Sequence, residues 1–86
     1  MCTYLTENVD VEGSGKGTAG WFALSQATVS FDHPQHAQAE HTLNIDFLNP
    51  QDGPAARVAV ELTAQSARAL AAAIESALAA APPGLI

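Results

Sequence analysis

The chain has 86 residues, of which 48% are hydrophobic, and it carries three basic and nine acidic residues for a formal net charge of −6. This length allows one small domain. The shortage of Lys and Arg argues against a nucleic-acid partner and against an anionic membrane surface, because both kinds of binding need clustered cations.

The core that this composition allows is thin. Alanine accounts for 18 of the hydrophobic residues and cysteine for one, which leaves 22 larger apolar side chains. A domain of this size buries only about 60–65% of the surface that its unfolded chain exposes. The chain either folds alone around a small core or buries further apolar surface against a second copy of itself. We expect the second arrangement, a homodimer.

Targeting signals are missing from the pattern. No apolar run approaches the ~20 residues that cross a bilayer, and the first ten residues show neither a basic nor an apolar signal region. The lone Cys2 has no partner for an intramolecular disulfide, which fits a reducing compartment. The sequence therefore predicts a cytoplasmic protein without a membrane segment.

The N-terminal segment has the pattern of a strand. From residue 3 to residue 11, the apolar Leu5, Val9 and Val11 alternate with polar residues, the period of a half-buried strand. Glu7 interrupts this pattern because it occupies an inward position between Leu5 and Val9. A local bulge or a sheet edge explains it, and a role as a general base is the alternative.

Residues 13–20, GSGKGTAG, contain four glycines. An ordered strand is costly there, so we expect a flexible connection that Trp21 and Phe22 end by anchoring the chain. The segment also invites a phosphate-binding interpretation, but Lys16 is followed by Gly17 and then by a strand instead of a helix. The spacing favours a hairpin connection.

Three further segments alternate apolar and polar residues and predict three more strands. A cluster of turn residues, NPQDGP, separates the last two. The inward positions are Ala27, Val29 and Phe31, then Leu43, Ile45 and Phe47, then Val58, Val60 and Leu62.

The last element is a helix that begins after Thr63, a residue suited to cap it, and runs to about Ala80. The apolar positions Ala67, Leu70, Ala71, Ile74 and Leu78 share one face. The fold class is therefore α+β: a four-stranded antiparallel sheet followed by one C-terminal helix packed on one face. We expect a single domain over residues 1–81 and a tail over residues 82–86.

All three histidines of the chain lie within nine residues, between Asp32 and Thr42. His33 continues the inward phase of the second strand and His41 precedes that of the third. They would lie at matching ends of adjacent antiparallel strands, with His36 reaching back from the loop. Imidazole suits zinc, copper, iron or nickel.

The histidines predict a divalent metal site, with zinc first and copper or iron as alternatives, whose ligands are His33, His36 and His41. Cys2 is a second-rank ligand, because the start of the first strand lies beside the end of the second. Glu40 and Glu7 are the candidate catalytic carboxylates, as base or hydrogen-bonding partner.

Two other arrangements stay open for the histidines. If Pro34 opens a helical turn, His36 and Glu40 share one face and give a two-histidine, one-carboxylate site with His33 or His41. Alternatively, the histidines cap strand ends or bond to nearby carboxylates and hold no metal.

The other face of the predicted sheet is polar. It carries Asn44, Asp46, Arg57 and Glu61, and Arg57 can pair with either carboxylate. This face is a solvated surface, a ligand floor or a dimer surface, and the pattern does not separate these.

The chain resembles a family of short uncharacterised bacterial proteins, a domain of unknown function. The resemblance rests on MCTYLTE, GSGKG followed by WF, DHPQHAQAEHTLNIDFLNP and RVAVELT. It implies a stand-alone protein of one domain and supplies no reaction.

The residues themselves suggest a small metal-binding protein, with metal-dependent catalysis as its extension. The alternative is a homodimeric module that binds a small ligand or a protein without metal.

Overall fold

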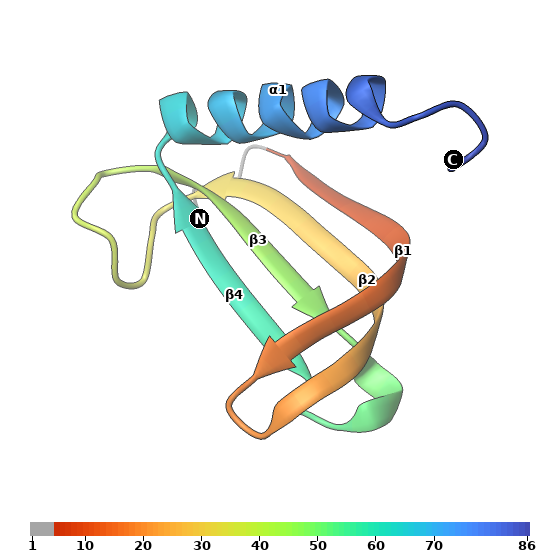
Figure 1. Cartoon of the computed structure of the whole chain (residues 1–86). Helices are drawn as coiled ribbons and strands as arrows, with labels where there is room; N and C mark the ends of the chain where they lie inside the picture. The colour runs from red at the N-terminus through yellow and green to blue at the C-terminus, as the bar shows by residue number, and fades with distance from the viewer. Residues whose placement is uncertain (1–4) are drawn as a thin grey trace.

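The computed structural model describes residues 5–86 and shows a single sheet with one helix across it (Figure 1). Every strand is antiparallel to its neighbour and the order in the sheet is β1-β2-β3-β4. The predicted fold class is therefore confirmed. The elements are β1 (Thr6–Gly17), β2 (Gly20–Asp32), β3 (Thr42–Leu48), the short 3-10 helix η1 (Pro50–Asp52), β4 (Arg57–Leu62) and α1 (Ala64–Ala80).

The register of β2, β3 and β4 gives the sheet two different faces. Val29 lies opposite Ile45, and Ile45 lies opposite Val60, so the apolar positions of the three strands share one face. One residue along, Asp46 lies opposite Thr28 and Ala59, which puts the polar positions on the other face. The helix α1 lies over the apolar face, across an apolar groove whose sheet side is lined by Val29, Leu43, Ile45 and Leu62.

The glycine-rich segment is an ordered strand, and the expectation of a flexible connection is wrong. β1 continues to Gly17 and pairs with β2 residue by residue from Gly13 onward. A Cβ atom at Gly15 would lie 3.3 Å from Leu24, and one at Gly17 would lie 3.3 Å from Phe22. Because glycine has no side chain, side chains of β2 can lie directly on the backbone of β1. This packing, together with the backbone hydrogen bonds between the two strands, offsets the conformational entropy that the glycines lose when they are ordered.

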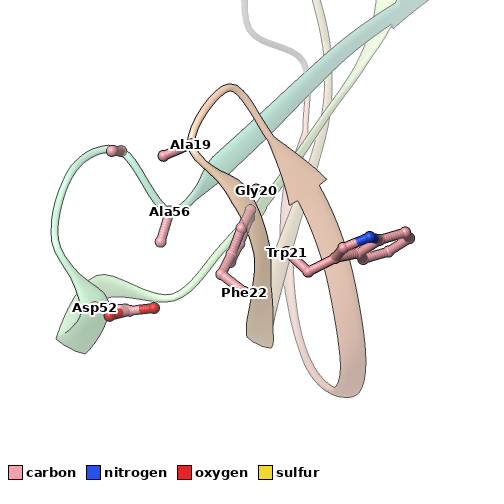
Figure 2. A pocket seen from close by; sticks show the side chains of 7 residues that line it. Ala19, Gly20, Trp21, Phe22, Asp52 and Ala56 are labelled. Carbon is pink, nitrogen blue, oxygen red and sulfur yellow. The ribbon is translucent and has the colours of Figure 1, made fainter.

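The β1–β2 turn depends on Gly20. In the described part of the chain no residue other than glycine has a positive φ, whereas Gly20 has φ of +116°. Beside this turn a depression of about 200 Å³ separates the hairpin from the β3–β4 connection. Figure 2 shows Phe22 on the side of Asp52 and Ala56, while the Trp21 indole projects away. Trp21 is 71% exposed, so the expected anchor is wrong for Trp21, and Phe22 is the half-buried residue.

The helix begins as predicted. The Thr63 hydroxyl accepts a hydrogen bond from the Ser66 N–H at 3.1 Å. At the other end the Ala81 N–H donates to the Leu78 carbonyl before Pro82 ends the helix. Within residues 5–86, no helix is long and apolar enough to cross a membrane.

The interior is as thin as the composition suggests. Among the described residues, the buried hydrophobic side chains are Ala27 and Ala56, and the buried polar one is Thr42. Thr42 donates its hydroxyl to the Asn44 side chain at 2.6 Å, which satisfies the donor that burial takes from water. No residue of α1 is buried.

We expect Gly20→Ala to destabilise the protein by about 1–3 kcal/mol, because an L-residue is strained at the positive φ of this turn. Gly13→Ala is the matched control, since its Cβ would meet no atom within 4 Å. Gly13→Ala should leave stability unchanged or raise it slightly. Urea denaturation at one protein concentration measures both, and equal losses in the two variants would contradict the assignment.

Candidate ligand-binding groove

A groove of about 570 Å³ lies on the polar face of the sheet. The sheet forms its floor and the β2–β3 loop, residues 33–41, borders it. Its size lies within the range of small-molecule sites. Its polar lining consists of Ser30, Asp32, Asn44, Asp46, Arg57 and Glu61 from the strands, with His33, Gln35 and His36 from the loop.

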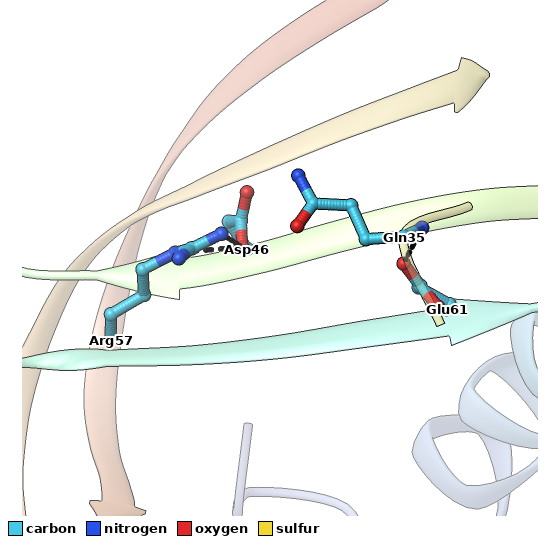
Figure 3. A network of polar contacts seen from close by, with 4 residues as sticks. All are labelled: Gln35, Asp46, Arg57 and Glu61. Atoms are coloured by element: carbon cyan, nitrogen blue, oxygen red, sulfur yellow. Dashed lines mark hydrogen bonds and ion pairs between the residues drawn. The ribbon is translucent and has the colours of Figure 1, made fainter. Parts of the chain in front are cut away.

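An ion pair between β3 and β4 lies at one end of the groove. The Arg57 guanidinium donates to Asp46 Oδ1 from Nε at 3.0 Å and from Nη2 at 2.7 Å (Figure 3). Of the two partners that the sequence left open, Asp46 is the one used. The Arg57 side chain is 57% exposed, so the pair contributes little to stability and mainly fixes where the two charged groups lie.

Glu61 holds the β2–β3 loop against the end of β4. Its carboxylate accepts the Gln35 N–H at 2.6 Å on Oε2, and the His36 and Ala37 N–H groups at 3.1 and 2.9 Å on Oε1. These donors, Gln35 first, favour the charged carboxylate and hold the pKa of Glu61 below its ordinary value of 4.5. The nearby His36 lowers this pKa further, and partial desolvation opposes the shift.

The loop held by Glu61 places an amide above the sheet. Figure 3 shows the Gln35 side chain extending over β3 toward Asp46, while its backbone meets Glu61. The sequence placed Glu61 on the polar face but did not reveal that it binds the loop. In the sequence, the only sign of this contact is that Glu61 is a carboxylate at the end of a predicted strand, and that the loop between the second and third strands is long enough to reach it.

The structure brings His33 and His41 together, as strand parity predicted. Their ring centroids are 4.5 Å apart with 29° between the planes, and His41 also stacks on Phe31 at 5.8 Å. His33 Nδ1 lies 2.9 Å from the Glu40 carbonyl oxygen. A carbonyl oxygen can only accept, so Nδ1 carries the hydrogen and Nε2 of the neutral ring has the lone pair.

The described geometry is not that of a metal centre. Imidazole lone pairs lie in the ring plane, so stacked rings direct them side by side instead of toward one point. His36 lies farther along the loop, next to Glu61. Within residues 5–86, no group of three or more His, Cys, Asp or Glu side chains is arranged to hold a metal ion. Cys2 lies outside the described residues, and the metal site stays a prediction.

The two candidate catalytic carboxylates lie apart from the groove. Glu7 is exposed on the edge strand β1, opposite Val29, which matches its interpretation as a sheet-edge residue. Glu40 contacts His33 through its backbone carbonyl, and the residue is exposed. Neither residue lines the groove. Their proposed catalytic roles therefore stay predictions.

We expect the Glu61 contact to make stability depend on acidity. Because the folded-state pKa lies below 4.5, the stabilisation is complete above that value and is lost as the pH falls through the folded-state pKa. Glu61→Gln should remove this part of the acid sensitivity. Urea unfolding between about pH 3 and pH 6 measures it.

The matched control for this measurement is Glu12→Gln, because Glu12 is an exposed residue of β1 outside the groove. That variant should keep the acid sensitivity of the original chain. If Glu61→Gln also keeps it in full, the carboxylate does not hold the loop in solution.

The comparisons with known proteins give one match. A family model described as a family of unknown function, DUF6295, matches residues 1–86. No curated protein and no solved structure matches the chain. The family match agrees with the resemblance stated above and adds no activity to it. The chain belongs to the DUF6295 family, whose function is unknown.

Proposed function

We propose that the protein binds a small, hydrogen-bonding cation, such as an alkylamine or a guanidine, in the groove on the polar face of the sheet. The observation that carries this proposal is the Glu61 contact, which holds a loop with a polar side chain, Gln35, beside a hollow of about 570 Å³. A loop fixed by a rigid strand is a common way to build a binding site.

The charges of the groove favour a cation over an anion. Its lining holds three carboxylates, Asp32, Asp46 and Glu61, and one permanent cation, Arg57, which is already paired with Asp46. The net charge of the whole chain is −6. The summed field of such a surface attracts small cations and repels anions.

The groove also offers neutral polar groups that can orient a ligand. The side chains of Ser30, Gln35 and Asn44 line it beside the charged residues. Asn44 accepts the Thr42 hydroxyl through Oδ1, and the second lone pair of this oxygen can accept an N–H of the ligand. A few placed polar groups of this kind give a site its selectivity.

A ¹⁵N–¹H correlation titration with methylguanidinium tests this proposal. We expect the backbone amides of residues 35–37, 44–46 and 57–61 to shift, and Asp46→Asn to weaken binding by about tenfold or more, because a charged hydrogen-bond acceptor is lost. Asp46→Asn also releases Arg57, so sodium acetate, which should not bind the original chain, should gain binding in this variant.

Asp52→Asn is the control for this titration, because Asp52 is exposed in η1, outside the groove. It should bind methylguanidinium as the original chain does. Acetate shifts equal to those of methylguanidinium in the original chain would overturn the proposal, and so would the lack of any shift at concentrations near about 10 mM, where a millimolar ligand is bound.

We keep metal binding as a second candidate because of one contact. A histidine that binds a metal commonly donates its other ring N–H to a carbonyl or carboxylate, and His33 Nδ1 makes such a contact with the Glu40 carbonyl. The His41 ring lies 4.5 Å away between centroids and would have to rotate to share an ion with His33. Zinc remains the first expectation, with copper or iron as alternatives.

Elemental analysis of untagged protein after gel filtration tests the metal. The expectation is about one ion per chain, lost in the double variant His33→Ala and His41→Ala and kept in Gln38→Ala. Metal below about a tenth per chain after supplementation during expression would reject this candidate. The Glu61 contact does not depend on the result, because its donors are the N–H groups of residues 35–37 and neither His33 nor His41 takes part.

We also propose that the protein acts in the cytoplasm. The support is its cysteine content, since Cys2 is the only cysteine and small secreted domains with thin cores commonly contain disulfides.

A further inference from the structure

The apolar stripe of α1 is left open to solvent. Leu70, Ile74 and Leu78 lie on the face that the sequence assigned to the core, yet they are 44%, 51% and 49% exposed. Of this face only Ala67 is partly covered. Figure 1 shows why: α1 crosses near one end of the strands, while the curved sheet extends away from it. An amphipathic helix that packs fully on its own sheet covers such a stripe.

An apolar groove of about 350 Å³ separates α1 from the sheet. Val29, Leu43 and Ile45 form its sheet side, and Leu70 and Ile74 form its helix side. Arg68 is the only charged residue of its lining, and it lies on the helix. Such a groove exposes side chains that ordinarily form the centre of a small domain.

The exposed surface of the chain is too large for a protein of its mass. It amounts to 6514 Å², whereas a folded protein of 8.9 kDa exposes about 4800 Å². The radius of gyration is 14.4 Å, against about 12 Å for a compact chain of this length. The excess of about 1700 Å² per chain exceeds the roughly 1000 Å² that each copy buries in the smaller obligate homodimers, so the chain has enough surplus surface for such an interface.

We infer that a second copy of this chain covers the apolar groove and the α1 stripe, so that the protein folds as a homodimer through this face. With Ala27 and Ala56 as the buried hydrophobic side chains of the described residues, one chain lacks the core that would hold α1 on the sheet. Burial of this apolar face is therefore needed for the chain to fold. A second copy of the chain is the one partner that is present wherever the chain is made.

A dimer with a two-fold axis buries both the α1 stripe and the apolar groove. In such an interface the same patch is used twice, so the α1 stripe of each copy enters the apolar groove of the other. No carboxylate lines that groove. The excess negative charge of each copy therefore stays off the contact, as the centre of a stable interface requires. The polar groove lies on the opposite face of the sheet and stays open.

The C-terminal tail is the competing occupant within the chain. Leu85 and Ile86 are exposed and lie five and six residues beyond the end of α1. Two such side chains cover roughly 200 Å² together, on the scale that relates buried area to transfer energy. That area is a small part of the excess of about 1700 Å², so the tail alone does not account for it.

Sedimentation velocity over about 1–100 µM tests the dimer. The original chain should sediment with twice the mass of 8.9 kDa. Ile74→Glu should abolish the dimer, because it puts a charge into an apolar contact in both copies. Ser76→Glu is the matched control, since Ser76 lies on the opposite side of α1, and it should remain dimeric. A folded monomer in the original chain, or a dimeric Ile74→Glu, overturns the inference.

A milder variant keeps the test decisive if Ile74→Glu does not fold. Ile74→Ala removes apolar contact without adding charge, and it should raise the dimer dissociation constant at least tenfold while circular dichroism shows a retained helix at high concentration. An unchanged dissociation constant would overturn the inference.

The position of the interface is tested by a mixed sample of isotope-labelled and unlabelled chains. Isotope-filtered NOEs between the methyl groups of Ile74 or Leu78 in one copy and Val29 or Ile45 in the other are expected. A dimer without interchain NOEs from α1 would place the interface elsewhere and overturn the inference. Truncation after Pro83 should leave the dimer intact, and a monomer in that variant would show that the dimer is held by the tail and would overturn the inference.

Discussion

The alternation of side chains across β2, β3 and β4 is the constraint on which both surfaces of this protein depend. Because neighbouring residues of a strand point to opposite faces, the register that places Val29 beside Ile45 also places Thr28 beside Asp46. A slip of one residue would exchange the two faces. The apolar groove under α1 and the polar groove on the other side therefore result from one pairing scheme.

The glycine-rich part of β1 shows how packing overcame a local preference. Sequence reasoning treated the glycines as an entropic cost, which is correct for an isolated segment. In the sheet their missing side chains make room for Leu24 and Phe22, which lie over the backbone of Gly15 and Gly17. This contact joins residues across a hairpin, so no pattern within the segment reveals it. The strands with clear alternation and the capped helix needed no such information, and their positions were predictable.

The candidate site was predictable in part for the same reason. Parity placed His33 and His41 at neighbouring strand ends, and the rings do meet. Whether two imidazoles stack or converge on an ion depends on side-chain torsions, which the spacing of residues does not determine. The contact of Glu61 with the loop is also invisible in the pattern, because backbone N–H groups at residues 35–37 carry no sequence signature.

The two faces of the sheet have opposite physical requirements, so each face suits a different function. An apolar face stabilises the fold only when it is covered, so it suits a permanent contact. A polar face with paired charges is stable in water and gains little from being covered, so it suits a ligand that comes and goes. A dimer joined through α1 and the apolar groove would turn its two polar grooves outward. The loop at each groove is held by Glu61, which belongs to the strand next to α1 in the chain. Covering α1 would therefore also steady the strand end on which this loop rests.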